Sequence, residues 1–317
     1  MANEAGLSGR RALVTGASGF IGKALCRRLM QHGVEVHGVS RTTRTPESPI
    51  TRWWQCSLED LNAVHTLLEV AKPDLIFHLA SNSAGSRALD LVVPIFHSNL
   101  HTTVNLLTAA TEVGCSRILL TGSMEEPDPS MDWPVPSSPY AAAKLAAGVY
   151  GRMFRALYNS PVVILRVFMV YGPGQQDVKK LVPYVVLGLL KGEVPKISSG
   201  TRDVDWIYVD DVVEGFVAAA VAPGVEGSTL DLGTGRLVTV RGVVEELVNI
   251  IRPPVPPVFG AMPERPMEQI RAANVEDTYR QLGWRAWMTL SDGLSRTVEW
   301  YRAQLISGPE KARLRRY

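Results

Sequence analysis

Tyr140 and Lys144, four residues apart, form the pair in this 317-residue chain that is best suited to acid–base chemistry. Ser138 can cap a helix and Pro139 suits its first turn, so we expect a helix that begins here. Residues four apart share a helical face, and a cation beside the phenol would lower the pKa of Tyr140. The pair is therefore a candidate proton donor or acceptor, although a chance pair on a solvated helix has the same spacing.

The second informative segment is a glycine-rich turn at residues 14–22. It follows an apolar run and precedes apolar residues at helical spacing. Gly16 would allow the tight turn, Gly19 would let backbone N–H groups approach a pyrophosphate, and Gly22 would let helix and strand pack closely. This order predicts a dinucleotide phosphate site, with a plain tight turn as the alternative. The residues that we assign to it are Gly16, Ser18, Gly19, Phe20, Ile21 and Gly22.

Composition narrows the classes of partner. A hydrophobic content of 46% is ample for a large core, and a net charge of +2 offers no argument for nucleic acid or for an anionic membrane. No segment approaches a transmembrane span, and three cysteines without metal-type spacing or a signal peptide favour the cytoplasm. His97 and His101 lie four apart but lack a third ligand, so we expect no metal.

The elements that must position these residues alternate along the chain. Strands are expected at 11–15, 34–39, 75–79, 117–121 and 162–167, and helices at 19–31, 58–70, 95–112 and from 140. This alternation predicts an α/β fold with a Rossmann-type, doubly wound parallel sheet. The expected dinucleotide-binding domain is 1–172, with 204–235 returning to it. A smaller α/β substrate-binding domain would comprise 173–203 and 236–317.

With both motifs in this order, the chain resembles the extended short-chain dehydrogenase/reductase family, which contains nucleotide-sugar epimerases, dehydratases and ketoreductases. The resemblance covers nearly the whole chain. It implies that Ser123 orients the substrate oxygen, that Tyr140 is the acid or base, and that Lys144 also holds the nicotinamide ribose. It implies an architectural role for Asn99, and we interpret His78 as a packed core residue.

The resemblance also locates the rest of the cofactor site. After the second strand, the family usually has an acidic residue that grips the ribose hydroxyls, whereas this chain has Ser40, Arg41 and Arg44. A hydroxyl with guanidinium groups would bind a 2′-phosphate, which predicts a preference for NADP(H) with NAD(H) possible. The alternative is that both arginines only solvate a loop. Further expected cofactor contacts are Ser57, which replaces an adenine-binding aspartate of the family, and Leu58, Leu79, Ala80 and Ser81.

Departures from the family concern the substrate. Met124 stands where related 4,6-dehydratases have an aspartate, which disfavours dehydration, and Glu125 is a possible auxiliary base. Met169 replaces a phosphate-binding asparagine, and Val204 replaces an arginine. Arg202, expected on the same strand face as Val204, and Arg265 are the remaining candidates for a diphosphate.

These observations leave three functions open. The favoured one is an NADP(H)-dependent ketoreductase that acts on a nucleotide-linked deoxysugar. A nucleotide-sugar epimerase with retained NAD would use the same three residues. A sensor of dinucleotide redox state would not need the proton donor Tyr140. The resemblance further implies a homodimer formed through the helices near 95–112 and 140–156.

Overall fold

The computed structural model describes residues 6–45, 49–128 and 134–306, and these residues form two packed units. The first unit comprises the chain through Val167 together with Val213–Leu232 and Asn274–Arg285. The second comprises Phe168–Val212, Gly233–Ala273 and the chain from Ala286 onward. The expected return at 204–235 therefore differs from the observed one, which begins at Val213, and a second return near the C-terminus lies inside the expected substrate domain.

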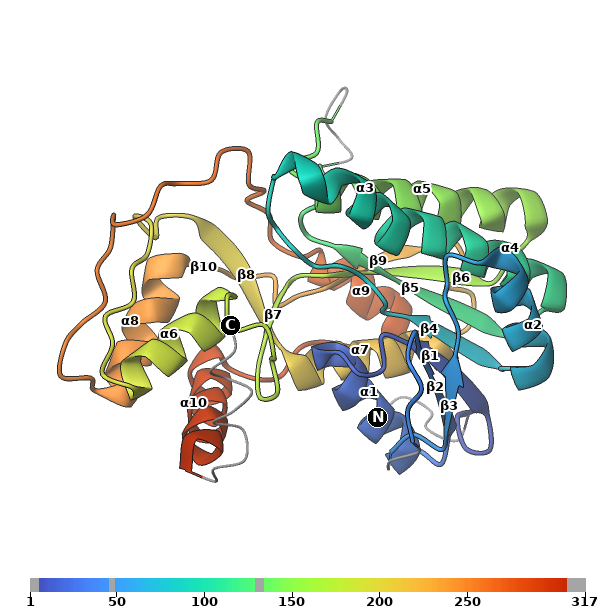
Figure 1. The fold of residues 1–317 in the computed structure, drawn as a ribbon, viewed down its shortest axis with the longest axis horizontal. Coiled ribbons are helices and arrows are strands. Elements are labelled where there is room, and N and C mark those ends of the chain that lie inside the picture. Colours follow the sequence, from blue (N-terminus) through green and yellow to red (C-terminus); the bar gives the residue numbers. More distant parts are fainter. Residues whose placement is uncertain (1–5, 46–48, 129–133, 307–317) are drawn as a thin grey trace. The chain divides into compact units, whose positions relative to one another are not determined.

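The first unit is built on a seven-stranded sheet in which every neighbouring pair is parallel (Figure 1). Its order is β3-β2-β1-β4-β5-β6-β9, so successive strands run outward in both directions from β1. The expected doubly wound Rossmann-type fold is thus confirmed. In such a sheet, ligands bind at the carboxyl ends of the strands where the order reverses, here β1 and β4. The strands are β1 (Arg11–Thr15), β2 (Glu35–Ser40), β3 (Arg52–Gln55), β4 (Leu75–His78), β5 (Arg117–Ser123), β6 (Val162–Val167) and β9 (Thr229–Leu232).

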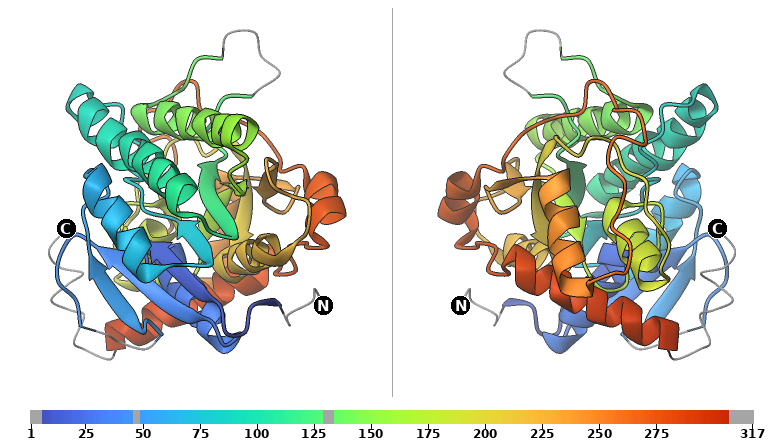
Figure 2. Two further views of the ribbon diagram at one scale, coloured as in Figure 1. Left: turned by 90° about the vertical axis from the view of Figure 1, so that its right-hand side faces the viewer. Right: turned by 90° about the vertical axis from the view of Figure 1, so that its left-hand side faces the viewer.

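Helices cover both faces of this sheet. Figures 1 and 2 show α2, α4 and α5 on one face, where their apolar sides enclose a core with β1, β4, β5 and β6. On the other face, Phe216 of α7 packs on Phe77 of β4, and Glu214 pairs with Arg28 of α1. The helices are α1 (Phe20–Gln31), α2 (Leu61–Ala71), α3 (Val92–Ile95), α4 (Thr102–Val113), α5 (Pro139–Tyr158), α7 (Val209–Val221) and α9 (Val275–Leu282).

Two local features differ from the sequence prediction. The strand β3 was not predicted, because its four residues are partly exposed and form no apolar run. It exists through parallel pairing with β2, in which Trp53 lies opposite Gly38. The helix predicted at 95–112 is three consecutive pieces, since a π-helical segment, η3 (Phe96–His101), separates α3 from α4.

The second unit contains a three-stranded sheet of order β10-β8-β7. β8 pairs parallel with β7 and antiparallel with β10, so its residues belong to the second unit. We had expected residues 204–235 to return to the dinucleotide-binding domain. Asp205 is fully buried and accepts hydrogen bonds from the backbone of Thr234, Gly235 and Ala273, which fixes two further chain segments against β8. The elements are β7 (Met169–Tyr171), α6 (Leu181–Leu190), β8 (Asp203–Tyr208), β10 (Leu237–Thr239), α8 (Val240–Ile251) and α10 (Leu290–Ile306).

Candidate active site

The glycine turn between β1 and α1 has the geometry that a dinucleotide requires. Gly16 has a φ of +70°, and a Cβ there would lie 2.7 Å from the backbone nitrogen of Ala80. A Cβ on Gly22 would overlap the Gly16 carbonyl oxygen. Gly19 is the N-cap of α1 and provides no capping side chain, so the first turn of the helix keeps its N–H groups for another acceptor.

The segment after β4 lies directly against this turn. Ala80 donates its N–H to Thr15 Oγ1 at 3.1 Å, and Leu79 donates to the Thr15 carbonyl at 3.2 Å. The Ser81 hydroxyl is buried without a hydrogen-bond partner among the described residues, as expected of a group that awaits a ligand. A cradle of this kind, closed to any Cβ and lined by free polar groups, fits a dinucleotide.

Asn99 fixes the chain that follows this segment. It is 2% exposed, accepts the Asn82 N–H through Oδ1 at 2.7 Å, and donates Nδ2 to the Asn82 carbonyl at 3.0 Å. These contacts agree with the architectural role expected of it. His101 and His97 are 3.5 Å apart through their Nδ1 atoms, and no group of three potential metal ligands occurs in the described part of the chain.

Ser40 and Arg44 come together at the carboxyl end of β2. Arg44 donates Nε to Ser40 Oγ at 3.1 Å, and its guanidinium lies 5.2 Å from the ring centre of Trp53. Arg41 is exposed beside them. A hydroxyl and a guanidinium group are thus hydrogen-bonded to each other at the end of β2, and their role at the cofactor ribose stays a prediction.

Ser57 and Leu58 follow β3 at the same edge of the sheet. The Leu58 carbonyl accepts the Asn105 side chain at 3.0 Å, and the Ser57 carbonyl accepts the Asp60 N–H at 3.2 Å. Ser57 itself is exposed and Leu58 is buried. Both residues lie on a segment held from α4 and from the start of α2, and their contact with adenine stays a prediction.

Ser123, Tyr140 and Lys144 meet beyond the carboxyl end of β5. The helix α5 begins as predicted, with the Ser138 hydroxyl accepting the Ala141 N–H at 3.1 Å. The Ser123 side chain is hydrogen-bonded to Tyr140, and Lys144, 6% exposed, donates to the Thr121 carbonyl at 2.7 Å. The strand end and the helix thus bring three residues into one site, although Ser123 and Lys144 are 21 positions apart in the sequence.

The protonation of Tyr140 differs from the expectation. Its pKa is raised to about 12, mainly by burial; the hydrogen bond to Ser123 opposes this rise, and the charges of Glu126 and Glu125 add to it. The expected lowering by Lys144 is wrong for this structure, because the ammonium lies 5.8 Å from the ring centre and is bound to Thr121. Burial in turn lowers the pKa of Lys144 to about 8. Tyr140 is therefore a protonated phenol at neutral pH, ready to donate.

His78 connects the cofactor turn to the catalytic strand. Its two ring nitrogens contact Thr15 Oγ1 at 2.8 Å and Thr103 Oγ1 at 3.0 Å, and its carbonyl accepts the Thr121 hydroxyl at 2.9 Å. Burial, with Lys144 nearby, lowers the pKa of His78 to about 3. His78 is a neutral core residue, as interpreted from the sequence.

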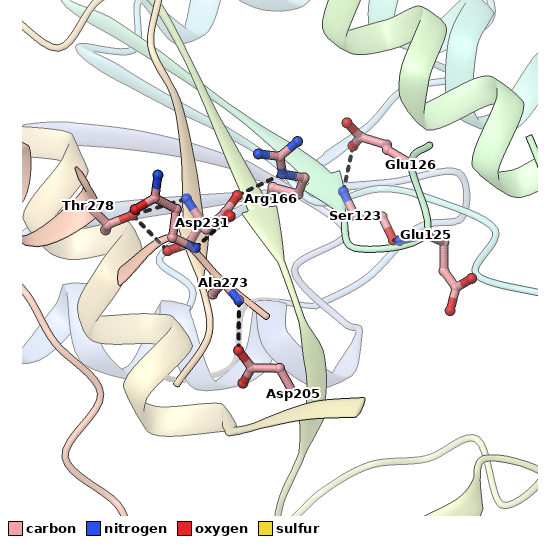
Figure 3. Close-up of polar contacts among 9 residues, drawn as sticks. Ser123, Glu125, Glu126, Arg166, Asp205, Asp231, Ala273 and Thr278 are labelled. Atoms are coloured by element: carbon pink, nitrogen blue, oxygen red, sulfur yellow. Dashed lines mark hydrogen bonds and ion pairs between the residues drawn. The ribbon is translucent and has the colours of Figure 1, made fainter. Parts of the chain in front are cut away.

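Two glutamates follow Ser123, and the structure separates them. Figure 3 shows the Glu126 carboxylate directed toward the Ser123 backbone, while the Glu125 carboxylate points away. Glu126 is 5% exposed and accepts the Ser123 N–H at 2.6 Å, whereas Glu125 is half-buried. Met124 is buried, so it offers no acid or base here. We predicted a role for Glu125 and missed Glu126, although Gly122, four residues before Glu126, could have indicated room for a side chain.

The predicted substrate residues all lie in the second unit. Arg202 precedes β8 and does not share a strand face with Val204, which is fully buried within β8. The Arg202 guanidinium contacts Glu268 at 3.1 Å and the Gln269 carbonyl at 2.9 Å. Arg265 is exposed and lies 3.9 Å from the same glutamate, so Glu268 connects the two arginines. Met169, at the start of β7, is half-buried.

Comparisons with known proteins identify a matching family and related sequences. Residues 12–233 match the family described as the NAD dependent epimerase/dehydratase family. The UDP-glucose 4-epimerase of Mycolicibacterium smegmatis is 32% identical over 315 residues, which span 92% of this chain and 98% of that protein.

Solved structures of related enzymes have a similar fold. The UDP-glucose 4-epimerase of Thermotoga maritima, solved with UDP-glucose, has a TM-score of 0.83 at 26% identity and covers 93% of this chain and 99% of its own. The UDP-glucose 4-epimerase of Thermus thermophilus, in complex with NAD, has a TM-score of 0.81 at 25% identity and covers 92% and 99%. Together with the glycine turn and the Ser123, Tyr140 and Lys144 site, these matches show that the chain belongs to the NAD-dependent epimerase/dehydratase family and is an enzyme of the extended short-chain dehydrogenase/reductase type.

Proposed function

We propose that this enzyme is an NADP(H)-dependent ketoreductase that acts on a keto group of a nucleotide-linked deoxysugar. The observation that carries the proposal is the protonated Tyr140 phenol, hydrogen-bonded to Ser123 at the end of β5. Reduction of a carbonyl needs a proton donor for the developing alkoxide, and a phenol with a raised pKa remains such a donor at neutral pH. The buried Met124 supports the absence of a dehydration step, which would need its own acid.

Each residue then has a defined task. The Ser123 hydroxyl orients the carbonyl oxygen by a hydrogen bond, and Tyr140 donates its proton to that oxygen. Lys144 holds its ammonium beneath the phenol ring and binds the cofactor ribose. A bound reduced nicotinamide supplies the hydride to the carbonyl carbon. Stabilising the charge that develops on the oxygen is the main contribution expected of the protein.

The preference for NADP(H) is inferred from the end of β2. The Ser40 hydroxyl and the Arg44 guanidinium are already hydrogen-bonded there, and Arg41 is exposed beside them. Changing Arg44 to Ala should weaken NADPH about 10- to 100-fold, the equivalent of about 1.5–3 kcal/mol for a charge-assisted contact, and leave NADH nearly unchanged. Arg52→Ala is the matched control, because Arg52 is also exposed and lies over a neighbouring tryptophan, Trp54. Equal losses for NADPH and NADH would reject the 2′-phosphate role.

A nucleotide-sugar epimerase with retained NAD is the second candidate. It is favoured by the 32% identity to a UDP-glucose 4-epimerase and by the similarity to an epimerase solved with NAD. The same Ser123, Tyr140 and Lys144 would serve both reactions. The dinucleotide released on denaturing the purified protein separates the two candidates. Tightly retained NAD supports the epimerase, and an empty site that binds NADPH supports the ketoreductase.

A nucleotide diphosphate in the substrate is supported by the cations of the second unit. Arg202 and Arg265 share Glu268, so a diphosphate that displaced this carboxylate would find two guanidinium groups already close together. Titration with UDP, dTDP and GDP in the presence of NADP⁺ tests this. Binding of one nucleotide that is lost in an Arg265→Ala variant supports the proposal. If none binds, the substrate is a carbonyl compound without a diphosphate.

We also propose a homodimer formed through α3, η3 and α5. These elements expose apolar side chains that a monomer would leave in water, namely Val93, Phe96, Val149 and Tyr150. η3 packs against α5 within the protomer, so these side chains lie on neighbouring elements. Exposed apolar side chains on adjacent elements are typical of an association surface.

A further inference from the structure

Glu126 is a buried carboxylate that the three-residue mechanism does not use. It is 5% exposed and lies three residues after Ser123, whose backbone N–H it accepts at 2.6 Å. A buried carboxylate is costly unless its charge is compensated by hydrogen bonds or by a cation. Its presence beside the reacting residues therefore needs an explanation.

The surrounding chain is shaped to admit this side chain. A Cβ on Gly122 would lie 2.8 Å from Glu126 Oε1 and 3.3 Å from the Arg166 Cα of the neighbouring strand. Any residue other than glycine at this position would push the carboxylate out. Gly122 and Glu126 thus form a matched pair, with the missing side chain of one making space for the carboxylate of the other.

Lys144 is a buried cation, so a negative charge nearby would stabilise it. It is 6% exposed, and within the described part of the chain it donates a hydrogen bond to a neutral carbonyl, that of Thr121. A buried ammonium without a counter-charge tends to lose its proton. Burial does lower the pKa of Lys144 to about 8, and the negative charge of Glu126 opposes that lowering.

The other charged groups around this position do not replace Glu126. His78 of β4 is neutral, because its pKa falls to about 3. Arg166 of β6 is a cation paired with Asp231 at 2.7 Å (Figure 3). Tyr140 is a neutral phenol, and the Glu125 carboxylate on the turn after β5 points away from Ser123 (Figure 3).

We propose that Glu126 is a positioning residue whose buried carboxylate holds the end of β5 and provides the counter-charge that keeps Lys144 an ammonium ion. Both tasks are performed at one strand end, because Glu126 accepts the Ser123 N–H and Lys144 donates to the Thr121 carbonyl two residues earlier in β5. Its effect on turnover rests on the proposed ketoreductase function, whereas its effect on Lys144 does not.

The direct test is a titration of Lys144 by NMR on protein labelled with ¹³C at lysine Cε. The Lys144→Met variant identifies the resonance. In Glu126→Gln, an amide oxygen can still accept the Ser123 N–H while the charge is removed, and the pKa of Lys144 should fall by about one unit, a tenfold easier deprotonation. Glu125→Gln is the matched control, and it should leave that pKa in place.

Two further measurements separate a counter-charge from a purely structural role. Glu126→Asp keeps the charge, so the pKa of Lys144 should stay closer to the wild-type value than in Glu126→Gln. In steady-state assays, the alkaline limb of kcat/KM should move to lower pH in Glu126→Gln by the same amount as the pKa of Lys144. An unchanged pKa of Lys144 in Glu126→Gln overturns the inference, even if that variant is less stable. A shifted pKa without any ketoreduction leaves the inference standing and rejects the proposed function instead.

Discussion

Replacing Gly16 with alanine tests the construction of the dinucleotide turn. Gly16 has a φ of +70°, in the left-handed region where an alanine costs about 1–2 kcal/mol. The new Cβ would also lie 2.7 Å from the Ala80 nitrogen and from the Leu79 carbonyl carbon, both backbone atoms that cannot rotate away. Overpacking of this kind costs about 1–3 kcal/mol. The two contributions predict a loss of about 2–5 kcal/mol in the free energy of unfolding.

Gly9→Ala is the control that separates these contributions. Gly9 also has a positive φ, +78°, but nothing lies within 4 Å of the position of its Cβ. It should therefore lose only the backbone contribution, about 1–2 kcal/mol. The difference of about 1–3 kcal/mol between the two variants measures how closely the segment after β4 approaches the turn.

Urea unfolding followed by circular dichroism gives both values, provided that the slope with denaturant matches that of the wild type. Because the chain has two units, that slope must be checked for each variant before the values are compared. Calorimetric titration with NADPH and NADH should show at least about a tenfold weaker affinity in Gly16→Ala and wild-type affinity in Gly9→Ala. If Gly16→Ala is no less stable than Gly9→Ala and binds both dinucleotides as tightly, the segment after β4 does not closely approach Gly16.

Three further predictions concern the chemistry, the response to acid and the assembly. Tyr140→Phe should keep its affinity for the dinucleotide and lose about 10²- to 10⁴-fold in turnover, whereas Lys144→Met should lose both, and a wild-type rate in the phenylalanine variant would assign the proton to another donor. His78 has a folded pKa of about 3 against an ordinary value of 6.5, so its contribution to stability is complete above pH 6.5 and is lost as the pH falls toward 3, by about 1.4 kcal/mol per unit. Urea unfolding between pH 7 and 4 should show this slope, and His78→Gln should flatten it. Phe96→Asp should convert the proposed dimer into a monomer in analytical ultracentrifugation, and an unchanged sedimentation coefficient would reject that interface.

The sequence was sufficient for features that depend on neighbouring residues. Apolar runs bounded by turn residues predicted β1 and β6 with their observed bounds, because buried parallel strands have no polar face to interrupt them. The Ser138 cap and Pro139 predicted the start of α5 for the same local reason.

Elements that exist only through pairing were not visible in the sequence. The strand β3 has no hydrophobic pattern of its own and owes its existence to β2. The strand β8 pairs with β7 in the second unit, although we expected residues 204–235 to return to the dinucleotide-binding domain. Strand periodicity identifies a strand but contains no information about its partner, because pairing is decided between segments that are distant along the chain.

The same division applies to the site. The spacing of Tyr140 and Lys144 determined that they share a helical face, and the glycine turn determined where a dinucleotide phosphate could approach. Only the tertiary structure decided the sign of the Tyr140 pKa shift and the position of the Glu126 carboxylate beside Ser123. Both depend on burial and on groups brought together from β5 and α5. A sequence specifies which groups can ionise. The protonation state of each group depends on how far the fold removes it from solvent and on which charges the fold places beside it.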